Sequence, residues 1–169
     1  MKHPRYLVLV AVFCGIVIQA QTTGGGKRSN TPPKFEDYPE REAWHGPPVP
    51  VRITSPPERL FRTQLREAAK QLPNFAGHYR FTFWGCGTRC AGGALVDLRT
   101  GSVFPPPLGG KASAESYWIF CTDWDKEHGA EYYPSSRLFV FHCGDDVHYF
   151  VWENNRFRQV LLVPEQNSN

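Results

Sequence analysis

The sequence predicts a mainly β protein of the α+β class, an antiparallel sandwich or partly open barrel with one N-terminal amphipathic helix packed on it. Three observations support this fold class. Apolar residues recur with a period of two over 78–104 and again over 137–163. Turn residues divide each of these stretches into a three-stranded meander. One segment, 55–72, has the three- and four-residue apolar spacing of a helix.

The first residues have the features of a secretory signal peptide over 1–20. Lys2 and Arg5 precede an apolar run over 6–18, and Ala20 places a small residue before the cleavage site. The run is shorter than the roughly 20 apolar residues that cross a bilayer. We therefore expect an exported protein, periplasmic or secreted, whose mature chain has no membrane span.

The remainder of the 169 residues suffices for one domain core. Residues 21–36 are mostly polar and predict a flexible lead, 37–164 a single β-rich domain, and 165–169 a tail. Removal of Lys2 and Arg5 lowers the formal charge from +3 to +1. This near-neutral balance argues against both a nucleic-acid partner and an anionic membrane surface.

The mature chain would contain an even number of cysteines, because Cys14 leaves with the signal peptide. The four that remain are Cys86, Cys90, Cys121 and Cys143. An even count in a short exported chain predicts disulfides, and four cysteines allow three pairings.

We favour Cys86–Cys90 with Cys121–Cys143 among the three pairings. The second bond closes a loop of about 22 residues and stabilises the fold by about 3 kcal/mol, the first by nearer 2 kcal/mol. The stretch "WGCGTRC" also fits half of a zinc site or a redox pair. Cys121 and Cys143 lack the paired spacing of zinc ligands, and the glycines around Cys86 indicate a loop rather than a helix start.

The helix is predicted from both its ends and its faces. Ser55 and Glu58 form a capping box, Pro56 suits the first turn, and Pro73 ends the helix. The apolar stripe consists of Phe61, Leu65, Ala68 and Leu72. The opposite face carries Arg59, Arg62, Arg66 and Lys70. Because the domain is near neutral, we interpret this basic face as solvated rather than as a surface for an anionic partner.

The strands follow from alternation and turn residues. A short edge strand is expected where Val49, Val51 and Ile53 alternate before the helix. The first meander is "HYRFTFW", "GALVDL" and "SVF", with "RTG" as a turn. The second is "RLFVFHC", "VHYFVWE" and "RFRQVLLV", with turns at "GDD" and "NN". The long connection between the meanders contains one further candidate strand, "YWIFC".

Several joined motifs resemble a known group of proteins. The motifs are "FRTQLREAAK", "PNFAGHY", "WGCGTRC", "ALVDLRTGSVF", "SSRLFVF" and "YFVWENNRF". Together they are similar to a group of small exported bacterial proteins of unassigned function, over about 38–162. The resemblance implies an exported single-domain protein of a Gram-negative bacterium, and it implies no reaction, cofactor or partner.

The candidate binding site is the glycine-rich cysteine loop. His78, Trp84, Thr88 and Arg89 are expected to converge there, with backbone N–H groups and the Arg89 guanidinium available to an anion. The alternative for His78 is a structural, hydrogen-bonded histidine at the start of a strand.

No catalytic set is evident in the sequence. Asp123, Asp125 and Glu127 alternate as calcium ligands do, but the loop lacks the EF-hand pattern and is interpreted as a solvated acidic loop. We therefore predict no cofactor, no metal, and a binding module for a protein, peptide or glycan. Two alternatives stay open. One is a metal-dependent or hydrolytic enzyme of the cell envelope, using His78, His128, His142 or His148; the other is a structural envelope component.

Overall fold

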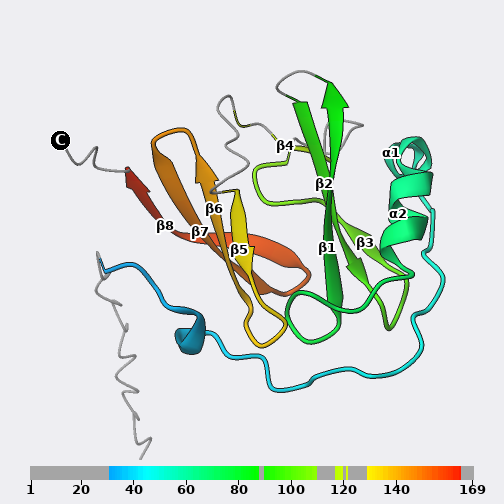
Figure 1. Cartoon of the computed structure of the whole chain (residues 1–169), viewed down its shortest axis with the longest axis horizontal. Helices are drawn as coiled ribbons and strands as arrows, with labels where there is room; N and C mark the ends of the chain where they lie inside the picture. Colours follow the sequence, from blue (N-terminus) through cyan, green and yellow to red (C-terminus); the bar gives the residue numbers. More distant parts are fainter. Residues whose placement is uncertain (1–30, 88–89, 110–116, 120, 122–128, 165–169) are drawn as a thin grey trace, which may run out of the picture.

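Two antiparallel four-stranded sheets form the protein (Figure 1). The computed structural model describes residues 31–87, 90–109, 117–119, 121 and 129–164. The helical elements are η1 (Phe35–Asp37), α1 (Pro56–Leu60) and α2 (Arg62–Ala68). The strands are β1 (Tyr79–Gly87), β2 (Cys90–Asp97), β3 (Val103–Phe104), β4 (Trp118–Ile119), β5 (Ala130–Tyr132), β6 (Leu138–Cys143), β7 (Asp146–Glu153) and β8 (Arg156–Pro164). The predicted mainly β sandwich is confirmed, and the described strands do not close a barrel.

The first sheet contains the first predicted meander. β2 pairs with β1 along one edge, and its other edge pairs with β3 at residues 95–96 and with β4 at residues 91–92. Alternation places Tyr79 and Phe81 on the face toward the second sheet, and Val96 on the face toward the helices. β4 is the short remnant of the strand predicted at "YWIFC".

The second sheet has the order β5-β6-β7-β8, so the second meander is extended by one strand. The predicted "NN" turn joins β7 to β8, and Asn154 and Asn155 both have positive φ, at 50° and 57°. This conformation is typical of a two-residue hairpin turn, which asparagine tolerates better than most residues. Gly144, at φ 58°, lies in the "GDD" turn between β6 and β7.

Aromatic side chains fill the space between the two sheets. The Phe81 ring of β1 lies 4.6 Å from the Phe139 ring of β6, measured between centroids. Phe75, just before β1, packs against Phe139 at 5.8 Å and against Phe157 of β8 at 5.8 Å. Phe75, Phe81 and Phe139 are fully buried. This inter-sheet core is the contact that makes two meanders one domain.

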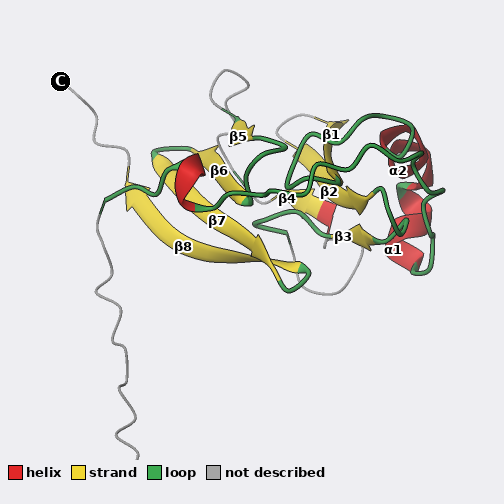
Figure 2. Ribbon diagram, turned by 90° about the horizontal axis from the view of Figure 1, so that it is seen from below, coloured by secondary structure: helices red, strands yellow, loops and turns green. Residues whose placement is uncertain are grey.

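The helices cover the other face of the first sheet, at one end of the molecule (Figure 2). The predicted capping box is present: Ser55 Oγ accepts from the Glu58 N–H, and the Glu58 carboxylate accepts from the Ser55 N–H. Leu65 and Ala68 are buried against Val96 as the stripe predicts. No helix among the described residues is long and apolar enough to cross a membrane.

The helix differs from the prediction in continuity and length. Phe61, with φ −105° and ψ 19°, separates α1 from α2, and α2 ends at Ala68 rather than at Pro73. Leu72 was predicted in the buried stripe, but its exposed fraction is 83%. The stripe fails there because the chain has left the helix before Leu72, so helical spacing no longer sets the direction of its side chain.

Residues 38–54, which we call the strap, run along one end of both sheets from η1 to α1 (Figure 1). Phe35 packs on Tyr133 at 4.6 Å, and Ser136 Oγ donates to the Phe35 carbonyl. Phe35, within the segment predicted as a flexible lead, therefore packs on the domain. The edge strand predicted around Val51 does not form; single backbone bonds, from Val49 to Leu98 and from Arg52 to Gly101, hold this part of the strap instead.

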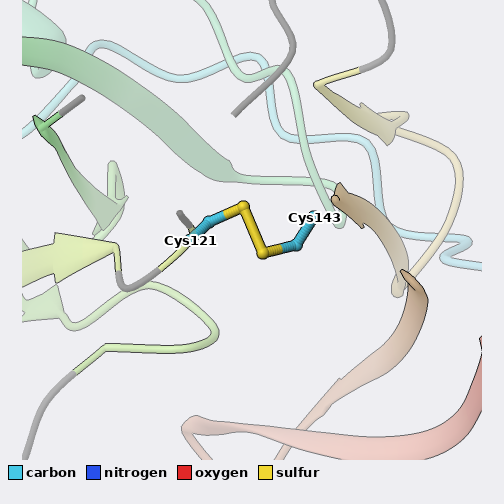
Figure 3. Close-up of a disulfide and its surroundings, with 2 residues drawn as sticks. All are labelled: Cys121 and Cys143. Atoms are coloured by element: carbon cyan, nitrogen blue, oxygen red, sulfur yellow. A yellow bond between two sulfur atoms is a disulfide. The ribbon is translucent and has the colours of Figure 1, made fainter. Parts of the chain in front are cut away.

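One of the two predicted disulfides joins the sheets. Cys121 follows β4 of the first sheet, Cys143 ends β6 of the second, and their Cα atoms lie 5.5 Å apart (Figure 3). The bond closes the 22-residue separation that the sequence indicated. The predicted Cys86–Cys90 bond would link β1 to β2 at the hairpin tip, and these two side chains lie outside the described part of the structure.

We expect the Cys121→Ala/Cys143→Ala variant to lose about 3 kcal/mol of unfolding free energy, because the cross-link restricts the unfolded chain. Urea unfolding of the variant and of the unchanged protein measures this difference. Peptide mapping of the unreduced protein should return the Cys121–Cys143 pair. A map that links either of these cysteines to Cys86 or Cys90 would contradict this connectivity.

Candidate functional site

Of the four predicted site residues the structure describes His78 and Trp84, and these two are not brought together. His78 directly precedes β1, whereas Trp84 is the sixth residue of that strand. Six residues of extended chain span about 20 Å. His78 and Trp84 therefore lie toward opposite ends of the sheet and do not share a site. Thr88 and Arg89 fall outside the described residues.

Trp84 packs between the first sheet and the helices. Its ring centroid lies 4.9 Å from that of Phe61, and the indole covers Gly92 on β2 so closely that a Cβ there would come within 2.2 Å of Nε1. The indole Nε1 is buried without a hydrogen-bond partner. Trp84 is thus a packing residue that requires glycine opposite it.

His78 lies where two of the sequence motifs meet. "NFAGHY" and "VDLRTG" are adjacent because Tyr79 of β1 is in register with Asp97 of β2. His78 Nε2 is 3.7 Å from Asp97 Oδ1, beyond hydrogen-bond length, and both side chains are about nine-tenths buried. Asp97 instead accepts from the backbone of Arg99 at 2.8 Å and from Thr100 Oγ1 at 2.8 Å. The carboxylate therefore fixes the β2–β3 turn.

Burial lowers the pKa of His78 below its ordinary value of 6.5, although Asp97 raises it. Arg99 lowers the pKa further, and Glu40 and Glu42 on the strap raise it. The net effect favours the neutral imidazole. Nε2 of this buried histidine has no hydrogen-bond partner among the described residues, so the hydrogen bond expected of a structural histidine is not seen at this nitrogen.

The histidines of the enzyme alternative are not gathered either. His142 on β6 is opposite Val147, and His148 on β7 is opposite Phe141, so the two side chains lie on opposite faces of the second sheet. His142 contacts Glu131 at 3.2 Å and His148 contacts Gln159 at 3.3 Å. His128 and the acidic loop of Asp123, Asp125 and Glu127 lie outside the described residues. Among the residues that are described, no three histidines, cysteines or carboxylates could jointly hold a metal ion.

The structure instead contains a groove that the sequence did not indicate. It has a volume of about 340 Å³ and lies between the strap, the chain after α2, and the loops around Gly77 and Pro134. The lining residues are Ala43, Trp44, His45, Gly46, Pro48, Lys70, Gln71, Leu72, Pro73, Gly77 and Pro134. Most of this lining is apolar or proline.

Glycines hold Trp44 in one position on the groove wall. The Trp44 N–H donates to the Gly77 carbonyl at 3.2 Å, and a Cβ on Gly46 would come within 2.8 Å of the indole. Gly77 has φ +78°, and a Cβ there would lie 2.3 Å from the Glu42 carbonyl oxygen. Close approach at both glycines thus seats the strap on the domain and orients Trp44.

Leu72 is held in solvent at the edge of the same groove. Its exposed fraction is 83%, the highest among the large apolar side chains that the structure describes. Arg80 of β1 fixes the backbone beneath it, donating from Nη1 to the Leu72 carbonyl at 3.3 Å and from Nη2 to Gln71 Oε1. The leucine is therefore presented by a braced chain.

Apart from the exposed His45, the polar side chains that line the groove are engaged within the protein. Lys70 is paired with Glu67 at 2.6 Å, and Gln71 Oε1 already accepts from Arg80. Proline has no backbone N–H, so Pro48, Pro73 and Pro134 add no donors. The arrangement is suited to contact with an apolar side chain.

Sequence reasoning missed this groove because its walls come from segments far apart in the chain. One signal was available: "EAWHGPPVP" places tryptophan beside glycine and prolines in a segment expected to dock on the domain. Leu72 gave no signal, since its spacing matched the buried stripe.

Comparison with known proteins adds no relationship. No family model matches the chain, and neither a curated protein nor a solved structure matches it.

Acid should destabilise the protein in part through His78. Because burial lowers its folded-state pKa, the unfolded chain binds more protons below about pH 6.5. The stability contributed by neutral His78 is complete above that pH and is lost as the pH falls toward the folded-state pKa. Urea unfolding at pH 7.5 and pH 5.5 should therefore show a smaller acid-induced loss for His78→Gln than for the unchanged protein.

His148, whose pKa burial also lowers, contributes to the dependence that remains in the His78→Gln protein. An equal loss of stability in His78→Gln and in the unchanged protein would show that His78 does not titrate with unfolding.

Proposed function

We propose that the protein is a binding module whose groove receives an apolar side chain of a protein or peptide partner. The observation that carries the proposal is Leu72, a leucine 83% exposed and braced by Arg80 beside the fixed indole of Trp44. Exposing such a side chain to water is unfavourable, and a partner that covers it recovers this free energy. Tryptophan beside a preformed groove is the usual anchor of a peptide interface.

A peptide suits the groove better than a glycan. Sugar hydroxyls need several planar polar side chains around the aromatic ring, whereas Lys70 and Gln71 are already engaged within the protein. An extended peptide can place one apolar residue against Trp44 and Leu72 while its own backbone stays solvated.

The proposed setting is outside the cytosol. The signal-like residues 1–20 support export, and the Cys121–Cys143 disulfide is the kind of bond that persists in an oxidising compartment. In this setting the partner would be a component of the envelope or its surroundings.

Selection from a random peptide library displayed on phage tests the groove directly. Synthetic peptides that survive selection should shift the NMR signal of the Trp44 indole N–H on titration. Trp44→Ala should weaken their binding by about 30-fold or more, because truncating a tryptophan anchor typically removes at least 2 kcal/mol. Trp118→Ala is the matched control, since Trp118 is 38% exposed on β4 and does not line the groove.

Selected peptides that bind Trp44→Ala as tightly as the unchanged protein would contradict the proposed site. Gly46→Ala adds an independent check, because the new methyl group must displace the indole without removing it. Its binding should weaken as well, with the thermal stability of both variants measured to exclude unfolding.

A further inference from the structure

Charge is unevenly distributed in this near-neutral protein. The helix layer, residues 55–72, contains four cations, Arg59, Arg62, Arg66 and Lys70, against the two carboxylates Glu58 and Glu67. Glu58 is buried within its capping box, so one carboxylate is exposed on the layer. Residues 35–46, which comprise η1 and the first part of the strap, have the opposite balance, with four carboxylates and one arginine. The net charge of the protein is therefore close to zero although the helix layer is basic.

The arginines of this layer remain available to an external partner. Arg59, Arg62 and Arg66 are exposed, and none forms an ion pair with any residue of the described ranges. The Arg62 guanidinium donates to the backbone carbonyl of Arg59 at 3.0 Å, which ties this side chain to α1. Lys70 alone is paired, with Glu67.

Exposed leucines alternate with these cations. Leu60 is 63% exposed and lies between Arg59 and Arg62 in the chain, and Leu72 is 83% exposed and follows Lys70. They are the two most exposed large apolar side chains among the residues described. α1 and α2 lie at one end of the molecule, together with the chain that leads into α1 (Figure 2).

We infer that the helix layer docks on an anionic lipid bilayer surface. Phospholipid headgroups would pair with the arginines, and Leu60 and Leu72 would reach into the boundary of the acyl chains. Basic residues near an anionic membrane and apolar side chains beside them are the two contributions that hold peripheral proteins on a bilayer. The inference does not depend on the function proposed for the groove.

A bilayer fits this layer better than an acidic protein does. A protein interface obtains most of its binding energy from apolar anchors clustered in one desolvated patch. Leu60 does not line the groove and lies between Arg59 and Arg62 in the chain, and a single leucine can insert into a membrane interface on its own. Arginine can keep its charged group among the headgroups while its methylene chain lies against lipid.

Vesicle sedimentation tests this docking surface. The protein is expressed with its full N-terminal sequence in a bacterial host and purified. Its N-terminal residue is then determined, so that all variants are compared with the same N-terminus. It should bind vesicles that contain phosphatidylglycerol, and bind them less at high salt, while phosphatidylcholine vesicles bind weakly. Each basic residue strengthens such binding about fivefold, so Arg62→Gln/Arg66→Gln should weaken it by about 25-fold.

Matched control variants distinguish vesicle binding through the helix layer from binding through other parts of the surface. Arg41→Gln/Arg156→Gln removes the same net charge from exposed positions on the strap and on β8, and should retain binding. Leu60→Ser should weaken binding, whereas Leu162→Ser, at a leucine 47% exposed on β8, should not.

Two results would overturn the inference. The first is an equal loss of vesicle binding in Arg62→Gln/Arg66→Gln and in Arg41→Gln/Arg156→Gln. This result would indicate that net charge alone attracts the protein to the vesicles. The second is binding of soluble polyglutamate that matches vesicle binding and is insensitive to Leu60→Ser, which would assign the layer to an acidic protein. Because Trp44 takes no part, failure here leaves the peptide result unaffected.

Discussion

Contact between aromatic rings across the two sheets is the interaction on which the rest of the structure depends. An antiparallel sheet has to bury its apolar side chains against a second layer to exclude water. Phe81 from the first meander and Phe139 from the second provide that layer for each other, with ring centroids 4.6 Å apart. Phe75 joins the same core from outside the strands and contacts Phe157 of the last strand. The Cys121–Cys143 disulfide then links the two sheets covalently.

The aromatic core fixes β1, and each face of this strand then packs against a different layer. Phe81 points toward the second sheet, while Arg80 and Trp84 point the other way, toward the helices. Arg80 braces the chain after α2, and the strap crosses the same end of the sheet on Gly77. The groove therefore results from the way the first sheet is covered. The strap and the chain after α2 lie next to each other there, and their side chains do not fill the space between them.

The sequence predicted what depends on local pattern. Alternation identified the strands of both meanders, and Asn154 and Asn155 identified a hairpin turn whose positive φ few other residues accept. Leu72 was misplaced because helical spacing says nothing about where a helix stops, and here the helix stops at Ala68. The His78 and Trp84 site was expected from nearness in sequence, but an extended strand converts six residues into about 20 Å. Trp44 and Leu72 meet only through tertiary folding, which no local pattern encodes.

The groove and the helix layer share a boundary, and this has a thermodynamic consequence. Lys70 and Leu72 line the groove and also belong to the helix layer. A peptide that covers Leu72 removes one of the two leucines available to a bilayer, and a bilayer that takes Leu72 removes part of the groove wall. Any coupling between two ligands of one protein is reciprocal, so each would lower the affinity for the other by the same factor. Lys70 and Leu72 are the shared residues, so that factor includes the contributions of both side chains. The protein could then hold a peptide and a membrane together, with each contact weakened but not abolished.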